Sequence, residues 1–223
     1  MSDSFVPRRS FLTRLAVGAA VVGTVPALAC AAPAPVADAL SPLDELETWL
    51  GTKPGAHKCI YDCVQPAGAT DGILFARNFM TYSHDELATA DTDMSVIVSF
   101  RHFATPYAYN DAIWSKYPQI AAMFKIDDPK TKKPAVRNIA LTDEVFGRSG
   151  ASLTALRARG ARFTACGAAT SFIADALAGP AGDAAAVRTE LLANLVPGAR
   201  VVPAGVVVVQ RAQKVGFAYT FAG

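Results

Sequence analysis

The chain has 223 residues and a formal net charge of +2 at pH 7. No basic patch and no interleaving of arginine with aromatic residues argues for nucleic-acid binding, so that class of partner is excluded. About 190 residues remain once an N-terminal targeting segment is set aside, and this length suits one domain with a sizeable core.

The N-terminal segment has the pattern of a secretory signal of the twin-arginine type. Arg8 and Arg9 stand in tandem, a weakly apolar run follows over residues 15–25, and residues 27–29 form a small-residue cleavage pattern. The apolar run is shorter than the roughly 20 residues that cross a bilayer. An ordinary secretory signal is the alternative, and both predict export to the periplasm, with the membrane involved only during export of the precursor.

Removal of residues 1–29 lowers the Lys+Arg count from 21 to 18 and the Asp+Glu count from 19 to 18, so the mature chain is nearly neutral. Residues 30–42 are rich in alanine and proline and predict an exposed tether. We expect residues 43–223 to form a single domain. Cys30 at the cleavage site raises the question of a lipoprotein, but Ala27 occupies the position where such signals usually have leucine.

Cysteine and histidine are few. Apart from Cys30, the thiols are Cys59, Cys63 and Cys166, and in an oxidising compartment they permit one disulfide with one free thiol, or three free thiols. Neither these cysteines nor the three histidines have the spacing of a zinc site. We therefore expect no metal and no cofactor.

From Ser41 the sequence alternates helices and strands. A capping serine, Asp44 three positions later and a final Gly51 predict a helix over 41–51. Residues 57–64 predict a first strand, and Thr70 opens a helix. The continuous apolar run MSVIVSF at 94–100 is typical of a strand buried on both faces of a parallel sheet.

The second half continues the alternation. It predicts helices over 108–124, 150–160, 170–179 and 184–196, the last ending before Pro197-Gly198, strands over 161–166 and 199–205, and an exposed polar connector over 125–138. The four valines at 206–209 favour a strand by propensity, whereas residues 210–216 look like a helix end with a glycine stop. Alternating elements predict a three-layer α/β fold with a mainly parallel sheet.

The C-terminal part of the sequence resembles the DsrE/DsrF-like sulfur-relay superfamily. The pattern is a strand ending in Cys-Gly, then L-x-P-G, a hydrophobic pair, P-x-G-V, a helix containing glutamine, and Gly-aromatic-x-Tyr. The matching residues are Cys166, Gly167, Leu195, Pro197, Gly198, Val201, Val202, Pro203, Gly205, Val206, Gln213, Gly216 and Tyr219. A second stretch is similar to exported members with twin-arginine signals, at Arg101, His102, Ala104, Thr105, Pro106, Asn110, Asp111, Trp114 and Tyr117.

The resemblance implies a flavodoxin-like, five-stranded parallel sheet, assembled as a dimer, trimer or hexamer. It also implies that residues 205–215 form a helix and that 217–221 form the last strand. In the sulfur-relay members a cysteine accepts sulfane sulfur as a persulfide and passes it on. Many members, including the exported group, have no assigned reaction.

Ligands of open parallel sheets gather outside the carboxyl ends of the strands. Cys63 follows the first predicted strand, Arg101 and His102 follow the second, and Cys166 follows the third, so these residues converge if the strands are neighbours. For Arg101 we expect a structural role, paired with Asp62 or another strand-end carboxylate, and the alternative is a role in binding an anion. A thiol beside an arginine or histidine and a helix N-terminus gains thiolate character, which persulfide chemistry needs.

Cys166 is therefore the candidate sulfur carrier, and the candidate binding residues for a small anionic or sulfur ligand are Arg101, His102, Cys63, Gly167 and Thr105. A Cys59–Cys63 disulfide would require a broken strand, because four extended residues span about 13 Å. Cys63 and Cys166 are the better candidates for a bridge or redox dithiol. The alternative function is a non-catalytic periplasmic binding or assembly module with structural cysteines.

Overall fold

The computed structural model describes residues 42–53 and 55–223, and these residues belong to one compact unit. The predicted signal segment and most of the predicted tether lie outside the described residues. The strands are β1 (His57–Cys63), β2 (Met94–Phe100), β3 (Arg162–Cys166), β4 (Ala199–Val202) and β5 (Ala218–Phe221). The α-helices are α1 (Pro42–Gly51), α2 (Pro66–Leu87), α3 (Asp111–Lys116), α4 (Gln119–Phe124), α5 (Leu153–Ala158), α6 (Gly167–Ala178), α7 (Ala184–Ala193) and α8 (Gly205–Lys214).

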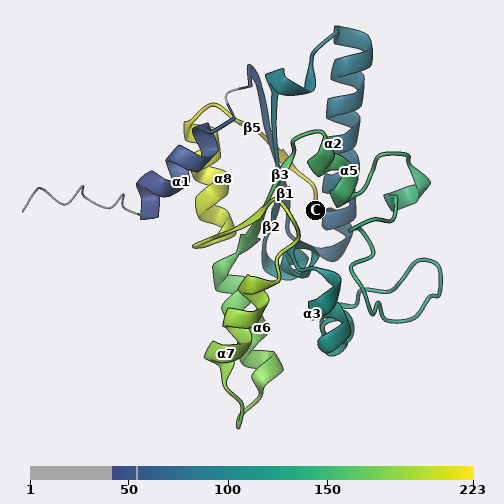
Figure 1. The fold of residues 1–223 in the computed structure, drawn as a ribbon, viewed down its shortest axis with the longest axis vertical. Coiled ribbons are helices and arrows are strands. Elements are labelled where there is room, and N and C mark those ends of the chain that lie inside the picture. Colours follow the sequence, from purple (N-terminus) through teal and green to yellow (C-terminus); the bar gives the residue numbers. More distant parts are fainter. Residues whose placement is uncertain (1–41, 54) are drawn as a thin grey trace, which may run out of the picture. The chain divides into compact units, whose positions relative to one another are not determined.

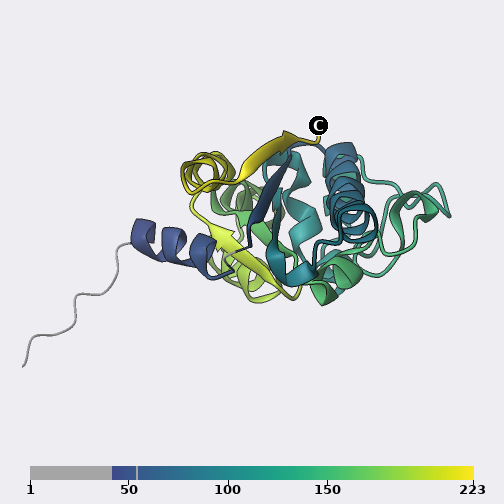
Figure 2. The ribbon, with the colours of Figure 1, turned by 90° about the horizontal axis from the view of Figure 1, so that it is seen from above.

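The five strands form one all-parallel sheet in the order β4-β3-β2-β1-β5. Helices α1 and α8 cover one face and α2 and α5 lie on the other, as Figures 1 and 2 show from two directions. The fold is therefore the predicted three-layer, flavodoxin-like α/β architecture. Every residue of β2 is buried, which agrees with its continuous apolar sequence.

Each face of the sheet has its own hydrophobic core. The larger cluster contains Phe100 and Phe163 and extends over α2 and α6. The smaller cluster joins Ile60 and Ile97 of the sheet to α1 and α8. A side chain at the end of a strand thus belongs to one of two separate environments, depending on the face toward which it points.

Several predicted element boundaries were wrong. Helix α2 begins at Pro66 rather than Thr70, because Gln65 is an extended N-cap and the ring of Pro66 fixes a helical φ at the first position. The helix predicted over 108–124 is divided into the end of a 3-10 helix (His102–Ala108), α3 and α4. Pro118 disfavours helical geometry at Tyr117, which leaves the helix at ψ 64°.

The valine run lies in α8, and β5 follows it, as the resemblance implied. Val208, Val209 and Ala212 are buried against the smaller core, whereas Val206 is 59% exposed. Burial of one side of the helix therefore overrides the β propensity of the valines.

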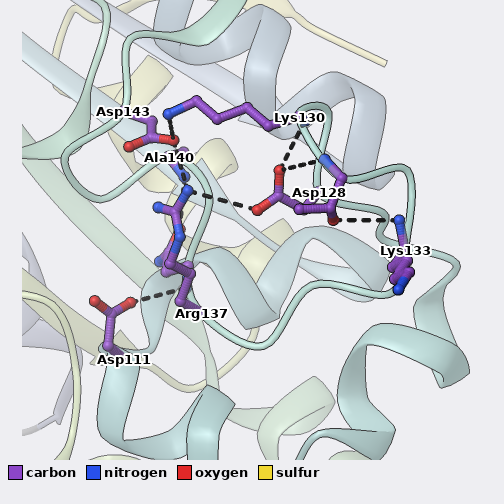
Figure 3. A network of polar contacts seen from close by, with 9 residues as sticks. Asp111, Asp128, Lys130, Lys133, Arg137, Ala140 and Asp143 are labelled. Atoms are coloured by element: carbon purple, nitrogen blue, oxygen red, sulfur yellow. Dashed lines mark hydrogen bonds and ion pairs between the residues drawn. The ribbon is translucent and has the colours of Figure 1, made fainter.

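The connector at 125–138 is exposed along most of its length, as predicted, but ion pairs organise it (Figure 3). Arg137 Nη2 lies 2.7 Å from Asp143 Oδ2 and 3.5 Å from Asp128 Oδ2. Lys130 Nζ lies 2.8 Å from the same Asp143 oxygen. These contacts hold the connector against the segment that follows it.

Asn138 fixes the end of the connector from inside the core. Its side chain is fully buried and donates hydrogen bonds to the carbonyl oxygens of Tyr107 and Tyr109 at 2.8 and 2.9 Å. The Asn138 Oδ1 accepts from the backbone N–H of Ala140 at 3.1 Å, and the backbone N–H of Asn138 donates to Asp111 Oδ1 at 2.8 Å.

Candidate functional site

The carboxyl ends of β1, β2 and β3 lie side by side, because these strands are neighbours in the sheet. Cys63 pairs in register with Phe100, and Phe100 pairs with Ala165. The predicted convergence of Cys63, Arg101 and Cys166 at one edge of the sheet is therefore confirmed at the level of the backbone.

The two strand-end thiols nevertheless lie on opposite faces. Cys63, Phe100 and Ala165 share the larger core, and Cys166, one residue beyond Ala165, points to the other side. With β2 between them, the strands are about 9.6 Å apart, whereas a disulfide needs Cα atoms within about 7 Å. Cys59, Cys63 and Cys166 are all free, so the predicted pairing of Cys63 with Cys166 is wrong.

Cys63 is a core residue. Its side chain is completely buried, and its sulfur lies against the α carbon of Gly72 in α2. Burial, reinforced by the charges of Asp62 and Asp71, raises the pKa of the Cys63 thiol well above its ordinary value. The neutral thiol is thus strongly favoured there, and Cys63 does not line the cavity described below.

Cys166 lies where two helices begin. It is both the last residue of β3 and the N-cap of α6, where its Sγ accepts the Ala169 N–H at 3.4 Å. The same sulfur accepts the Gly205 N–H from the start of α8 at 3.3 Å. Helix N-termini carry positive partial charge, so two of them converge on one sulfur.

Gly167 allows this convergence. A Cβ at Gly167 would stand 2.9 Å from the Val202 carbonyl oxygen and 3.1 Å from that of Pro203. The Ala168 amide also donates to the Pro203 oxygen at 3.1 Å. Gly167 therefore lets the turn after β3 pack against the turn after β4, which brings α8 to Cys166.

Arg101 is anchored by a buried carboxylate. Its Nε and Nη2 donate to Asp62 Oδ1 and Oδ2 at 2.7 and 2.9 Å, as predicted for this pair, and Tyr219 Oη donates to Oδ2 at 3.0 Å. Asp62 is only 1% exposed. Its hydrogen bond raises the pKa of Arg101, and the charges of Tyr219 and Cys166 act in the same direction. Burial and the hydrogen bond to Asp62 raise the pKa of Tyr219.

His102 and Thr105 have different environments. His102 is exposed, has a φ of 52°, and stacks on Phe103 with ring centroids 3.9 Å apart. The Thr105 side chain is completely buried, and its hydroxyl has no hydrogen-bond partner among the described residues. Thr105 is absent from the residues that line the cavity with His102, so the structure separates these two candidates.

A cavity of about 520 Å³ brings together Cys166, Arg101 and His102 at the carboxyl edge, whereas the candidate Gly167 is not among its lining residues. Its lining contains Arg101, His102, Phe103, Cys166, Ala168, Ala169, Phe172, Ala204, Gly205 and Val206. Sequence reasoning missed the apolar members of this lining. A phenylalanine in the segment after β2 and another within α6 give little sequence signal of a cavity, because a phenylalanine in such a segment is usually part of the core. The Gly205 donor is 39 residues from Cys166, so no local pattern indicates this contact.

A second, larger cavity of about 740 Å³ lies between the start of α2 and the connector. Lys125, Asp127 and Lys130 contribute charges of both signs to its wall, beside apolar residues such as Ile126 and Phe146. No cysteine or histidine is among its lining residues in the described part of the chain.

Within residues 42–53 and 55–223, no group of three or more histidine, cysteine, aspartate or glutamate side chains is arranged to hold a metal ion. Among the helices that the structure describes, none is both long and apolar enough to cross a membrane. Comparison of the chain with family models, with curated proteins and with solved structures gave no match.

Proposed function

We propose that the protein is a DsrE-like sulfur carrier that accepts sulfane sulfur on Cys166 as a persulfide. The observation that carries this proposal is the position of Cys166 Sγ, which lines a cavity and accepts two backbone N–H groups from the starts of α6 and α8. Such donors favour a sulfur atom that carries negative charge, as both a thiolate and a persulfide anion do.

The transfer step is a displacement at sulfur. The Cys166 thiolate attacks the terminal sulfane sulfur of a donor persulfide, a new S–S bond forms on Cys166, and the donor S–S bond breaks. The donor thiolate leaves with the electron pair, so no oxidant or reductant is needed. The new terminal sulfur extends into the cavity, from which a second thiolate can remove it by the same chemistry.

Arg101 supports the anionic states of this step. Its guanidinium lines the same cavity, and the bidentate contact with Asp62 limits the orientations it can adopt. The bonds to Asp62 use Nε and Nη2 of Arg101, which leaves its third guanidinium nitrogen, Nη1, for an anionic ligand. The charge of Cys166 also favours the Arg101 cation.

The second candidate function is a non-catalytic module that binds a small ligand in the same cavity. The observation in its favour is that Cys166 is only 6% exposed and that most of the lining is apolar. In this function the cysteines are structural, and the sulfur of Cys166 serves as the N-cap of α6.

Intact-mass measurement distinguishes the two functions. The protein is incubated with inorganic polysulfide, and sulfur carriage predicts an adduct of about 32 Da, one sulfur atom, that a reductant removes. Peptide mapping is expected to assign the added sulfur to Cys166. The adduct should be lost in Cys166→Ser and retained in the matched variant Cys63→Ala. A folded protein without any adduct would favour the binding module.

Export and self-association belong to the same proposal. Export to the periplasm rests on residues 1–29 and predicts that the protein from the periplasmic fraction starts near residue 30, which N-terminal sequencing checks.

Self-association is supported by the edge strand β5, whose Tyr219 and Phe221 are 43% and 57% exposed. Light scattering on the purified protein measures the mass, and a monomer at all concentrations would contradict this part.

A further inference from the structure

The cavity above Cys166 has an apolar mouth and a polar floor. Phe103, Phe172 and Val206 line it and are 38%, 57% and 59% exposed, although they are large hydrophobic side chains. Leaving such side chains in water forgoes the free energy that burial would provide, so an apolar ligand gains by covering them. The small side chains of Ala168, Ala169 and Ala204 leave room between them.

The floor carries the groups that suit an anion. Cys166 Sγ meets the N–H groups of Ala169 and Gly205, and the Arg101 guanidinium lies in the same lining. His102 adds an imidazole to this lining. His102 is exposed and stacks on Phe103, so its imidazole lies toward the mouth. The Arg101 guanidinium, anchored on the buried Asp62, and the two N–H groups are the polar groups of the floor, and the remaining lining residues besides the thiol are apolar or glycine.

Size and burial limit what can reach the thiol. Cys166 is 6% exposed, so a donor must insert its reactive sulfur beyond the cavity mouth. A volume of about 520 Å³ is within the range of roughly 300–1,000 Å³ that is usual for small-molecule sites. A lone inorganic sulfur anion would leave the apolar mouth uncovered.

On the basis of the proposed sulfur carriage, we infer that the donor is a small organic molecule in which an apolar group bears an anionic sulfane sulfur, as in an organic persulfide or thiosulfonate. Its apolar group contacts Phe103, Phe172 and Val206. Its anionic sulfur faces Cys166 and Arg101.

For a thiosulfonate donor the step balances without a further reactant. The Cys166 thiolate attacks the terminal sulfur, the bond between that sulfur and the sulfonyl sulfur breaks, and the sulfinate leaves with the electron pair. Thiosulfate undergoes the same step with sulfite as the leaving group. The two donors therefore present the same kind of reacting bond, but they differ in the apolar group, in net charge (one negative charge against two) and in the leaving group, so the rate ratio is interpreted together with the effect of the Phe172 variant.

The test compares benzenethiosulfonate with thiosulfate as donors, following the rate of sulfur addition to Cys166 by intact mass. We expect the aryl donor to react about tenfold faster or more, because it covers apolar surface that thiosulfate leaves exposed. Phe172→Ala should lower the aryl rate severalfold and leave the thiosulfate rate unchanged. The matched variant is Tyr82→Ala, which removes an equally exposed ring, 57% in both cases, from α2 and outside the cavity. It should change neither rate.

A measurement on the unmodified protein serves as a second test. Benzenesulfonate, which has no sulfur to transfer, should slow loading by the aryl donor, and methanesulfonate at the same concentration should not. Equal rates for the two donors, with no effect of Phe172→Ala or benzenesulfonate, would overturn the inference while leaving sulfur carriage intact. The inference would also be overturned if Phe172→Ala changed the mass of the oligomer and left both donor rates unchanged. That result would mean that another copy of the chain covers the cavity mouth. Loading from neither donor nor polysulfide would contradict the proposed function itself.

Discussion

The side chain of Arg101 lies directly against the α carbon of Gly205. A Cβ at position 205 would stand 2.7 Å from Arg101 Cδ and closer still to Arg101 Cβ. The same glycine donates its N–H to Cys166 Sγ at 3.3 Å. One residue without a side chain thus links the arginine, the thiol and the start of α8.

Gly205→Ala should therefore displace Arg101 or α8. We expect a loss of about 1–3 kcal/mol in the free energy of unfolding, measured with urea, because the added methyl group overpacks a filled space. Sulfur loading of Cys166 should also slow. The matched control is Gly51→Ala at the end of α1, where a Cβ would meet nothing within 4 Å. Equal stability of Gly205→Ala and the wild type would contradict this expectation, because it would show that Arg101 moves away from the added methyl group at no cost in free energy.

Removing the carboxylate of Asp62 should release Arg101. We expect Asp62→Asn to lower the free energy of unfolding by roughly 2 kcal/mol, since a buried charged partner is lost while Arg101 remains partly in water. The rate of loading should fall as well. Asp85→Asn, which removes a partner of His84 on the surface, should change stability by less than about 0.5 kcal/mol. Similar stability losses in the two variants would contradict the anchoring role of Asp62.

The thiols should differ in reactivity toward iodoacetamide. Cys63 is fully buried and its pKa is raised, so it should stay unmodified in the folded protein at pH 8. Cys166 lines a cavity and should be alkylated. Peptide mapping before and after denaturation in urea measures both, and in urea all thiols should react. Alkylation of Cys63 ahead of Cys166 in the folded protein would contradict the assignment.

The ion pairs of Asp143 should make the stability of the fold depend on pH in the acid range. Hydrogen bonds from Arg137 and Lys130 lower the pKa of Asp143 to about 2 in the folded protein, below the unfolded value of about 3.9. The stabilisation by this carboxylate is therefore complete above about pH 4 and is lost as the pH falls through about 2. The urea midpoints of the wild type and Asp143→Asn should differ at pH 6 and converge toward pH 2. A difference independent of pH would show that the ion pairs do not stabilise the fold.

Asn138→Ala should be the most disruptive change in the connector. The variant leaves the Tyr107 and Tyr109 carbonyls and the Ala140 amide without their partner in the core. We expect a loss of about 2–4 kcal/mol in the free energy of unfolding, measured with urea. Asn78→Ala, which removes one contact with the adjacent Arg77, should cost less than about 1 kcal/mol. Equal losses in the two variants would show that the connector is held by other contacts.

The strands and their shared edge were predictable from the sequence because the signals are local. The apolar run of β2 and the strand-end positions of Cys63, Arg101 and Cys166 follow from residue pattern alone. A strand-end carboxylate as the partner of Arg101 also follows, because residues at the carboxyl ends of parallel neighbours meet at one edge, and the structure identifies that partner as Asp62.

The side of the sheet toward which Cys63 and Cys166 point could not be predicted from the local sequence. Whether Cys63 and Cys166 meet depends on strand order and on a register shift of one residue, which reverses the face of a side chain. The donation from Gly205 to Cys166 likewise depends on how the turns after β3 and β4 pack. The valine run is a further example, because its residue types favour a strand, whereas its burial against α1 stabilises a helix.

The anchor of Arg101 is assembled from strands that are distant in the chain. Asp62 belongs to β1, whereas Tyr219 belongs to β5 and is 157 residues later. Because β5 pairs with β1, the edge of the sheet beside Asp62 is completed only when the last strand arrives. During synthesis, β1 therefore keeps one open edge until β5 has been made, and the Asp62–Tyr219 contact can form only after the last strand has been synthesised.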